Sequence, residues 1–260
     1  MLSIGHQIRN RLLLALPTAS REGLSQYLDW VLLRPGQVLC SPGTPSKYAY
    51  FPVGSVVSLL CLTEDGGATE VATVGDEGVV EMPLLLGGES CAYRAVVRNG
   101  GYSYRCPGHL LGLEVDHSTA LQRLLLRYAY SLLTQMAQTA VCNRYHSLFQ
   151  QLCRWLLLSL DRSRSNEILM TQESIAQILG VRREGVTEAA GRLRSRRVID
   201  YRRGAIVVVD RASLERSTCE CYAVFTRTTR HASPEYRELA TTRQPQSPSS
   251  FPLVTAHAAA

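Results

Sequence analysis

Residues 171–209 read TQESIAQILGVRREGVTEAAGRLRSRRVIDYRRGAIVVV, and this stretch decides the fold of the chain. Its first part carries apolar residues at helical spacing on one face: Ile175, Ile178 and Leu179. Gly180 ends that segment, and Ala176, four residues earlier, is small enough to let two helices cross closely. A second helical pattern follows, with an apolar inner face formed by Val186, Ala189, Ala190 and Leu193. Two short helices joined by a glycine turn are typical of a helix-turn-helix.

Residues 198–209 predict a β-hairpin directly after the second helix. Two apolar runs flank a turn that carries Arg202, Arg203 and Gly204. A hairpin in this place is the wing of a winged helix-turn-helix. We therefore expect the second helix, Arg182–Arg194, to lie in the DNA major groove with its N-terminal residues at the base edges. The wing, Arg202–Gly204, is expected to contact phosphates.

The charge distribution favours the same interpretation. Between residues 182 and 203 there are eight arginines and three acidic residues, a net charge of +5, whereas the whole chain of 260 residues carries +6. Nearly all of the net charge therefore lies where phosphate contacts need it. A solvated basic helix pair without a ligand is the simpler alternative. The coincidence of helix spacing, turn, wing and charge favours binding of double-stranded DNA.

The rest of the sequence narrows the class of protein. No apolar run approaches the ~20 residues that span a bilayer. The N-terminal apolar run, Leu12–Leu16, is too short for a signal peptide and no small-residue cleavage site follows it. We therefore expect a cytoplasmic protein that does not contact a membrane. Its eight scattered cysteines need no disulfides there, and most should be buried small hydrophobic residues.

Residues 31–115 have the pattern of an all-β domain. Short apolar runs alternate with glycine and proline signals, and the strands recur at a spacing of roughly 8–12 residues. Asp65-Gly66-Gly67 is the strongest hairpin turn among them. Together with a helical entry, this region predicts a sensory β-barrel over residues 10–117.

A long helical pattern begins near Ser118 and continues to residue 143. An apolar stripe near heptad spacing runs along it: Leu121, Leu124, Leu125, Tyr128, Leu132, Met136 and Thr139 or Ala140. This is more apolar surface than one small β-domain would cover, so we expect residues 118–143 to form the seam of a parallel homodimer. Packing of the helix on its own β-domain is the alternative.

A second helix, about Tyr145–Ser159, is expected to open a DNA-binding domain over residues 144–217. Asp210 is a suitable N-cap for a short last helix, Arg211–Ser217. Beyond Phe225 few apolar residues remain, so residues 227–260 are predicted to be a disordered tail. The predicted class is α+β, with a β-barrel first, a long helix second and a winged helix-turn-helix last.

This order of parts resembles the Crp/Fnr family of bacterial transcription regulators. The resemblance covers roughly residues 10–217 and is strongest in LMTQE (169–173), IAQILGV (175–181) and RREGVT (182–187). The β-domain is similar to the family's cyclic-nucleotide-binding jelly roll in RPGQVL (34–39), YFP (50–52) and VGDEG (74–78). The segments AVCNR (140–144) and CECY (219–222) resemble a subgroup of the family whose signals are poorly known.

The resemblance implies roles for particular residues. In the family, an Arg-Glu pair in the first turn of the second helix and a polar residue one turn later read the bases. Arg183 and Glu184 match the pair, and Glu188 holds the later position, where arginine is common. Since arginine donates to guanine and glutamate accepts from cytosine, the operator should differ from that of the family's prototype. Five residues are better placed for phosphates: Arg182, Thr187, Arg192, Arg202 and Arg203.

The resemblance also implies partners. A homodimer would read a palindromic operator whose half-sites lie about one helical turn apart. RNA polymerase is a further candidate partner. Whether the protein activates or represses, and which genes it controls, does not follow from the sequence.

The effector of the β-domain is left open. Cyclic-nucleotide binding needs a glutamate for the ribose and an arginine followed by serine or threonine for the phosphate. Glu81 and Arg94 are the candidates, but Ala95 stands where the hydroxyl is needed and Pro83 interrupts the short helix expected after Glu81. We therefore expect a different small-molecule effector or an empty pocket, and no cofactor.

The cysteines and histidines bear on two other kinds of sensing and on metal binding. An iron–sulfur cluster needs closely spaced N-terminal cysteines, and none precedes Cys40. The isolated histidines give no pattern for a haem ligand. Four residues remain, Cys142, His146, Cys219 and Cys221, which are the right number for tetrahedral zinc. Cys-x-Cys is tighter than the usual spacing, so packing or a redox-active thiol cluster stays an alternative.

Two other classes of function are weaker alternatives. A cupin-type enzyme would need a histidine and glutamate cluster, for which His109, Glu114 and His117 are the only local candidates. No second histidine motif complements them, so no enzymatic activity is expected. A scaffold that does not bind DNA would not explain why the arginines are concentrated between residues 182 and 203.

Overall fold

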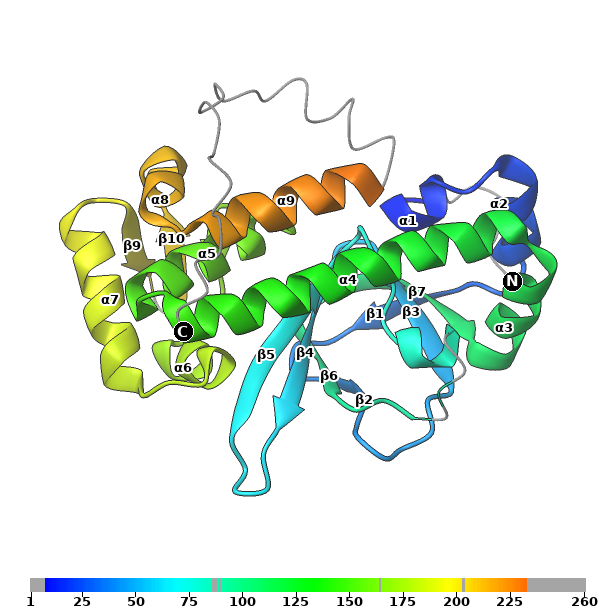
Figure 1. Cartoon of the computed structure of the whole chain (residues 1–260), viewed down its shortest axis with the longest axis horizontal. Helices are drawn as coiled ribbons and strands as arrows, with labels where there is room; N and C mark the ends of the chain where they lie inside the picture. Colours follow the sequence, from blue (N-terminus) through cyan, green and yellow to red (C-terminus); the bar gives the residue numbers. More distant parts are fainter. Residues whose placement is uncertain (1–7, 86–87, 89, 164, 203, 233–260) are drawn as a thin grey trace, which may run out of the picture.

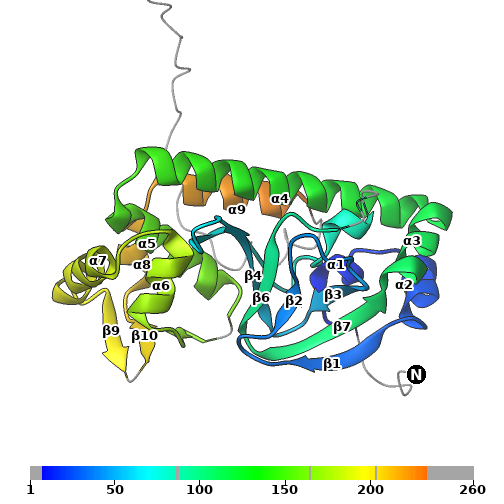
Figure 2. The ribbon, with the colours of Figure 1, turned by 90° about the horizontal axis from the view of Figure 1, so that it is seen from below.

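The computed structural model describes residues 8–85, 88, 90–163, 165–202 and 204–232. A β-rich N-terminal domain and a smaller, mostly helical C-terminal domain lie side by side, and one long helix runs along both (Figures 1 and 2). Among the described residues, no helix is both long enough and apolar enough to cross a bilayer.

The N-terminal domain begins with two short helices and continues with seven strands. Its elements are α1 (Arg11–Leu14), α2 (Thr18–Ser25), β1 (Asp29–Leu33), β2 (Val38–Cys40), β3 (Tyr48–Pro52), β4 (Val56–Leu62), β5 (Ala68–Val74), η1 (Met82–Leu85), β6 (Arg94–Asn99), β7 (Gly101–Pro107) and α3 (Gly108–His117). The predicted turn at Asp65-Gly66-Gly67 is confirmed: it joins β4 to β5, and Gly66 has a φ of 86°.

The strands form two antiparallel sheets, with the orders β1-β7-β3 and β2-β6-β4-β5. Both sheets contribute to one core, in which Phe51 and Tyr104 are fully buried. The predicted mixed fold class is confirmed, but the described strands do not close into the predicted barrel. No described strand of one sheet pairs with a strand of the other, so each sheet keeps two edge strands.

Helix α4 (Thr119–Tyr145) follows α3, and the side chain of Ser118 caps its N-terminus. The stripe predicted to be a dimer seam lies largely inside this subunit: Leu121, Leu124, Leu125, Tyr128 and Leu132 are buried in the core of the N-terminal domain. The assignment of the stripe to a dimer seam was therefore wrong. The β-domain covers more of this helix than its size suggested, because both sheets and α4 share a single core.

A different face of α4 carries exposed apolar side chains. Leu126, Tyr130 and Leu133 are 56%, 66% and 64% exposed, and Val141 and Tyr145 continue the row toward the end of the helix. Their spacing of three and four residues, with Ala137 between, is that of a helix–helix contact.

The C-terminal domain has its own core. Its elements are α5 (Leu148–Asp161), β8 (Glu167–Ile168), α6 (Gln172–Leu179), α7 (Arg183–Ser195), β9 (Ile199–Arg202), β10 (Ala205–Val208) and α8 (Arg211–Ser217). Ser147 and Gln150 form a capping box that starts α5 directly after α4. The predicted N-cap at Asp210 is confirmed, since its side chain accepts from the backbone N–H of Ser213 at 2.9 Å.

A last helix, α9 (Glu220–Ala232), packs along α4 (Figures 1 and 2). The prediction of a disordered tail from residue 227 was therefore wrong for residues 227–232, which continue this helix. The reason is tertiary: the buried Phe225 and the contact with α4 hold a segment that is polar by composition. The rest of the predicted tail, residues 233–260, lies outside the described residues.

Candidate DNA-binding face and sensory pocket

The two helices of the helix-turn-helix meet at Gly180. Thr171 caps α6 through a hydrogen bond from the N–H of Ser174, and Gly180 ends the helix in the left-handed conformation with a φ of 66°. The N–H of Val181 then donates to the carbonyl of Ala176 at 3.0 Å, which closes the turn. Arg182 precedes α7 in an extended conformation, so the first turn of α7 begins at Arg183.

Helix α7 has one buried and one exposed face, as predicted. The buried face packs into the core of the domain through Val186, Ala189, Ala190 and Leu193. The exposed face carries the side chains predicted for the bases, Arg183, Glu184 and Glu188. In Figures 1 and 2, α7 lies on the outer side of its domain, away from the β-rich domain, so its exposed face is open to a macromolecule.

Gln172 lies at the centre of a hydrogen-bond chain that fixes α7. The hydroxyl of Thr187 donates to the Oε1 of Gln172 at 2.7 Å, and the Nε2 of Gln172 donates to the hydroxyl of Tyr201 at 2.9 Å. The chain links α6, α7 and the first strand of the hairpin. Thr187 was predicted to contact a phosphate; in the structure its hydroxyl makes a positioning contact with Gln172.

Two arginines near the end of α7 stack on one aromatic ring. The guanidinium carbons of Arg192 and Arg196 lie 4.6 and 5.5 Å from the ring centroid of Phe149, at the start of α5. Cation–π contacts of this kind orient a cation without neutralising it. Arg192, which was predicted to contact a phosphate, therefore keeps its charge, and the ring of Phe149 restrains its guanidinium.

The predicted wing is a hairpin. Strands β9 and β10 pair antiparallel, with Arg202 opposite Ala205, and β8 adds a third strand on the other side of β10. Gly204 has a φ of 69°, which suits the tight turn. Arg202 is exposed at the tip of β9. Arg203, the other predicted phosphate contact of the wing, lies outside the described residues.

Polar side chains join the C-terminal domain to the β-rich domain. The Nε of Arg162, at the end of α5, donates to the Oε1 of Glu77 at 2.7 Å, and Arg11 lies 3.6 Å from the same carboxylate. Burial alone would raise the pKa of Glu77, but the guanidiniums of Arg162 and Arg11 outweigh it and lower that pKa. A cavity of about 350 Å³ lies beside this pair, between the two domains.

A second contact between the domains involves the hairpin of β4 and β5. The indole N–H of Trp155 donates to the Oε1 of Glu70 at 3.1 Å, and the guanidinium of Arg98 lies 5.1 Å from the centroid of the Trp155 ring. Thr69 donates to the carbonyl of Ile178 in α6 at 3.4 Å. Sequence reasoning missed both contacts, because the partners are 85 and 109 residues apart and no local pattern marks them.

The two residues predicted for an effector differ in their surroundings. Glu81 is buried with a φ of 83°, its Oε2 accepts from the hydroxyl of Ser46, and its Oε1 has no hydrogen-bond partner in the described residues. Arg94 is exposed at the start of β6. No described hydrogen bond or ion pair joins them, and the carboxylate of Glu81 lies instead within 4.8 Å of the thiols of Cys40 and Cys91.

Comparisons with known proteins bear on the C-terminal domain first. Residues 150–217 match the family model of the Crp-like helix-turn-helix domain. This region is a Crp-like helix-turn-helix domain. A comparison with curated protein sequences finds no match.

Solved structures share the fold of most of the chain. A transcriptional regulator of the Crp/Fnr family from Eubacterium rectale is 16% identical with a TM-score of 0.63, and the match covers 79% of this chain and 96% of that one. FixK2 from Bradyrhizobium japonicum is 18% identical with a TM-score of 0.62, covering 74% and 98%. TTHA1359, a Crp/Fnr-family regulator from Thermus thermophilus, is 21% identical with a TM-score of 0.60, covering 72% and 97%.

The resemblance to the Crp/Fnr family is therefore confirmed at two levels. The Crp-like helix-turn-helix domain is matched by sequence, and the combination of β-rich domain, long helix and this domain is matched by fold.

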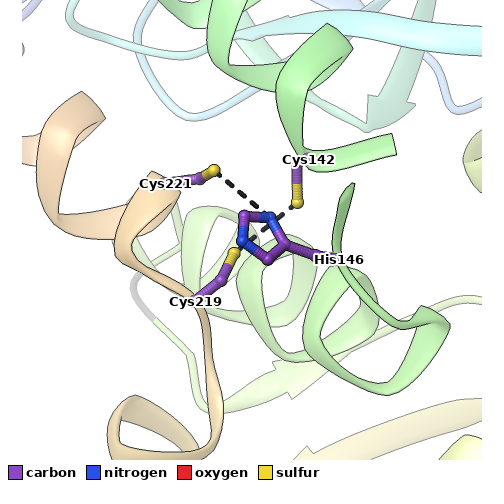
Figure 3. Close-up of side chains that lie close together, drawn as sticks. All are labelled: Cys142, His146, Cys219 and Cys221. Carbon is purple, nitrogen blue, oxygen red and sulfur yellow. Dashed lines mark hydrogen bonds between the residues drawn. The ribbon is translucent and has the colours of Figure 1, made fainter. Parts of the chain in front are cut away.

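The four residues predicted as a metal site meet just behind the Crp-like helix-turn-helix domain. Cys142 and His146 come from the end of α4, and Cys219 and Cys221 come from the start of α9 (Figure 3). No local pattern indicates that the two pairs meet, and the structure brings all four side chains together.

Proposed function

We propose that the protein is a homodimeric, sequence-specific transcription regulator of the Crp/Fnr type. The observation that carries this proposal is the face of α7, where the charged side chains of Arg183, Glu184 and Glu188 are exposed on a helix whose other face is anchored in the domain core. A fixed helix with a free polar face is what major-groove recognition requires.

The chemistry of the side chains decides which of them we assign to bases and which to phosphates. Arg183 can donate two hydrogen bonds to guanine, while Glu184 and Glu188 can accept from cytosine N4. The phosphate contacts are assigned to Arg182, Thr187, Arg192, Arg202 and Arg203. Arg192 supports the assignment, because its cation–π contact with Phe149 leaves the charge available to DNA.

The proposed division into domains places the sensory domain at 10–117, the dimer helix at 118–143 and the DNA-binding domain at 144–217. The dimer contact we propose uses the exposed row of α4, Leu126, Tyr130, Leu133 and Val141, with a second copy of the same helix as its occupant. The heptad-like spacing of this row and the two half-sites of a palindromic operator both call for two copies related by a twofold axis. Within the cell, RNA polymerase is the proposed partner at the promoter.

The β-rich domain is proposed to sense a ligand other than a cyclic nucleotide. Glu81 and Arg94 lack a shared site, and Ala95 is buried without a hydroxyl. Calorimetry with cyclic AMP and cyclic GMP should show no heat of binding, and a micromolar affinity for either would contradict this. The Oε1 of Glu81 and the hydroxyl of Tyr93 are both buried without described hydrogen-bond partners, so a polar ligand of this domain could satisfy them.

We infer that the protein acts without catalysis and inside the cell. The alternative enzyme site, His109, Glu114 and His117, lies along the single helix α3, and no metal-ligand group in the described residues includes any of the three.

The first experiment selects bound DNA from a random pool and then titrates the selected sequence at increasing salt. A palindrome with half-sites about one turn apart and a steep salt dependence is the expected result. Failure to enrich any sequence, with binding that is equal for all DNA, would contradict sequence-specific regulation. Absence of salt-dependent binding altogether would instead favour a scaffold.

Two matched variants distinguish side chains that contact bases from side chains that contact phosphates. Arg183→Ala should cost about 1–3 kcal/mol on the selected sequence and relax the preference at one position of each half-site. Arg202→Ala should weaken selected and random DNA alike and lower the salt slope by about 1. Identical behaviour of the two variants on both kinds of DNA would show that these roles are wrongly assigned.

A further inference from the structure

A small buried cluster joins the end of α4 to the start of α9. Cys142 lies in the last turn of α4, His146 is the residue that ends this helix, Cys219 precedes α9 and Cys221 lies in its first turn (Figure 3). The three cysteines are at most 5% exposed, and the side chain of His146 is 13% exposed. The cluster is thus assembled from segments more than 70 residues apart and is closed to bulk solvent.

The distances in the cluster suit one ion rather than a covalent bond. The Sγ atoms of Cys142 and Cys219 are 3.6 Å apart, the Sγ of Cys221 lies 3.6 Å from the Nδ1 of His146, and all four ligand atoms fall within 4.8 Å of one another. In tetrahedral zinc with Zn–S near 2.3 Å and Zn–N near 2.0 Å, neighbouring ligand atoms lie roughly 3.5–3.8 Å apart. A disulfide would instead need about 2.05 Å between the two sulfurs.

We propose that Cys142, His146, Cys219 and Cys221 bind one zinc ion in a tetrahedral site with three sulfurs and one nitrogen. Soft thiolates together with an imidazole select zinc over the hard cations. The donors lie too close together to serve the several metal atoms of an iron–sulfur cluster, so a single ion fits. With four protein ligands the site is closed, as structural zinc sites are.

The outer contacts of His146 are those of a metal-bound imidazole. Its Nδ1 faces Cys221, and its Nε2 lies 3.2 Å from the Oε1 of Glu220. A carboxylate on the far nitrogen fixes the tautomer that leaves the near nitrogen free to bind metal. The backbone is held as well, since the Nε2 of Gln151 donates to the carbonyl of His146 at 2.9 Å.

The charge around the cluster also suits a bound zinc ion with three thiolate ligands. Zinc with three thiolates and a neutral imidazole carries a net charge of −1. Arg154 is buried beside the cluster, where its positive charge acts on the thiols of Cys142 and Cys221. In the described residues Arg154 forms no ion pair with a carboxylate, and its Nε has no hydrogen-bond partner. A buried cation in this position balances a site with one excess negative charge.

Simple packing explains the cluster less well. The three cysteines form a core of their own that contains no aliphatic side chain, and an imidazole and a guanidinium face it.

The site would tie two segments into one unit. The ion would join the end of α4 to the start of α9, and its ligand His146 directly precedes Ser147, where the capping box of α5 begins the DNA-binding domain. Zinc would therefore set the angle at which that domain leaves the long helix. This inference does not rest on DNA binding, because its readout is metal content.

The test is elemental analysis of the full chain purified without an affinity tag. About one zinc per chain is expected for the wild type and for two control variants, Cys61→Ser, which changes an exposed cysteine, and Cys91→Ser, which changes the other buried cysteine cluster. Cys142→Ser and Cys221→Ser should each lose most of the zinc. Less than one zinc per ten wild-type chains, or equimolar iron or copper in its place, would overturn the proposal.

A second measurement covers the case in which the variants fail to fold. Wild-type protein reconstituted with Co²⁺ should show the intense visible bands of a tetrahedral ion and a thiolate charge-transfer band, both of which zinc abolishes. Octahedral cobalt spectra would refute the site. So would a thiol titration of the untreated protein that finds two thiols fewer than the eight cysteines of the sequence, as a disulfide between Cys142 and Cys219 requires.

Discussion

Replacing Arg162 with methionine should weaken the junction between the β-rich domain and the helix-turn-helix domain. The side chains of Arg162 and Glu77 are only 3% and 11% exposed, so the variant leaves a carboxylate buried without its nearest cation. Breaking a buried pair from one side costs about 3–5 kcal/mol. Because Arg11 still lies 3.6 Å from Glu77, we expect the lower end, about 3 kcal/mol.

The assay is urea unfolding of the full chain, followed by circular dichroism, in a double-mutant cycle with Glu77→Gln. The coupling energy between the two positions should be about 1–3 kcal/mol. Arg105→Met is the matched control, because its ion pair with Asp29 is largely exposed and should be worth less than about 1 kcal/mol. Equal destabilisation by Arg162→Met and Arg105→Met, or a coupling near zero, would refute the reasoning.

The same pair predicts a pH dependence with a definite sign. The pKa of Glu77 is lower in the folded protein than its ordinary value of 4.5. Its contribution to stability is therefore fully present above pH 4.5 and is lost as the pH falls through the lowered pKa. In Arg162→Met, less positive charge opposes the effect of burial on the pKa of Glu77, so that pKa should be higher than in the wild type. The loss of stability on acidification should therefore begin at a higher pH. Unfolding midpoints measured between pH 7 and pH 3 check this.

Three further changes test other parts of the fold. Gly180→Ala should destabilise the helix-turn-helix by about 1–2 kcal/mol in urea unfolding, because φ is 66° there and the new Cβ would lie 2.8 Å from the Oγ1 of Thr69. A neutral result would mean that the turn tolerates a side chain. Leu133→Arg should convert the dimer to a monomer in light scattering at matched concentration, and an unchanged mass would remove the exposed face of α4 as the seam. Asp210→Ala should cost about 1 kcal/mol of unfolding free energy through the lost N-cap of α8, whereas Asp210→Asn should cost less.

The helix-turn-helix was predictable because its signals are local. The positions of Val186, Ala189, Ala190 and Leu193 follow from helical periodicity, and the left-handed turn at Gly180 follows from the residue type. Each of these depends on a few neighbouring residues. The buried and exposed faces of α7 could therefore be assigned without knowing the rest of the fold.

Contacts between distant segments could not be predicted in this way. Periodicity shows which positions of α4 are apolar, but it does not tell whether Leu125 meets its own domain or Leu133 a second copy. The pairing of Glu77 with Arg162 leaves no trace in spacing. For the cysteine cluster, the offset from Cys142 to His146 was visible, whereas its meeting with Cys219 depends on α9 packing back along α4.

The stacking of Arg192 and Arg196 on Phe149 has a consequence for the thermodynamics of the proposed DNA binding. Ordering a long, flexible side chain on association costs about 0.5–1.5 kcal/mol of conformational entropy. Two arginines already held on a ring have lost much of that freedom before DNA arrives. If Arg192 contacts a phosphate as proposed, part of the entropic penalty of that contact moves from the association step to folding, where the core of the C-terminal domain offsets it.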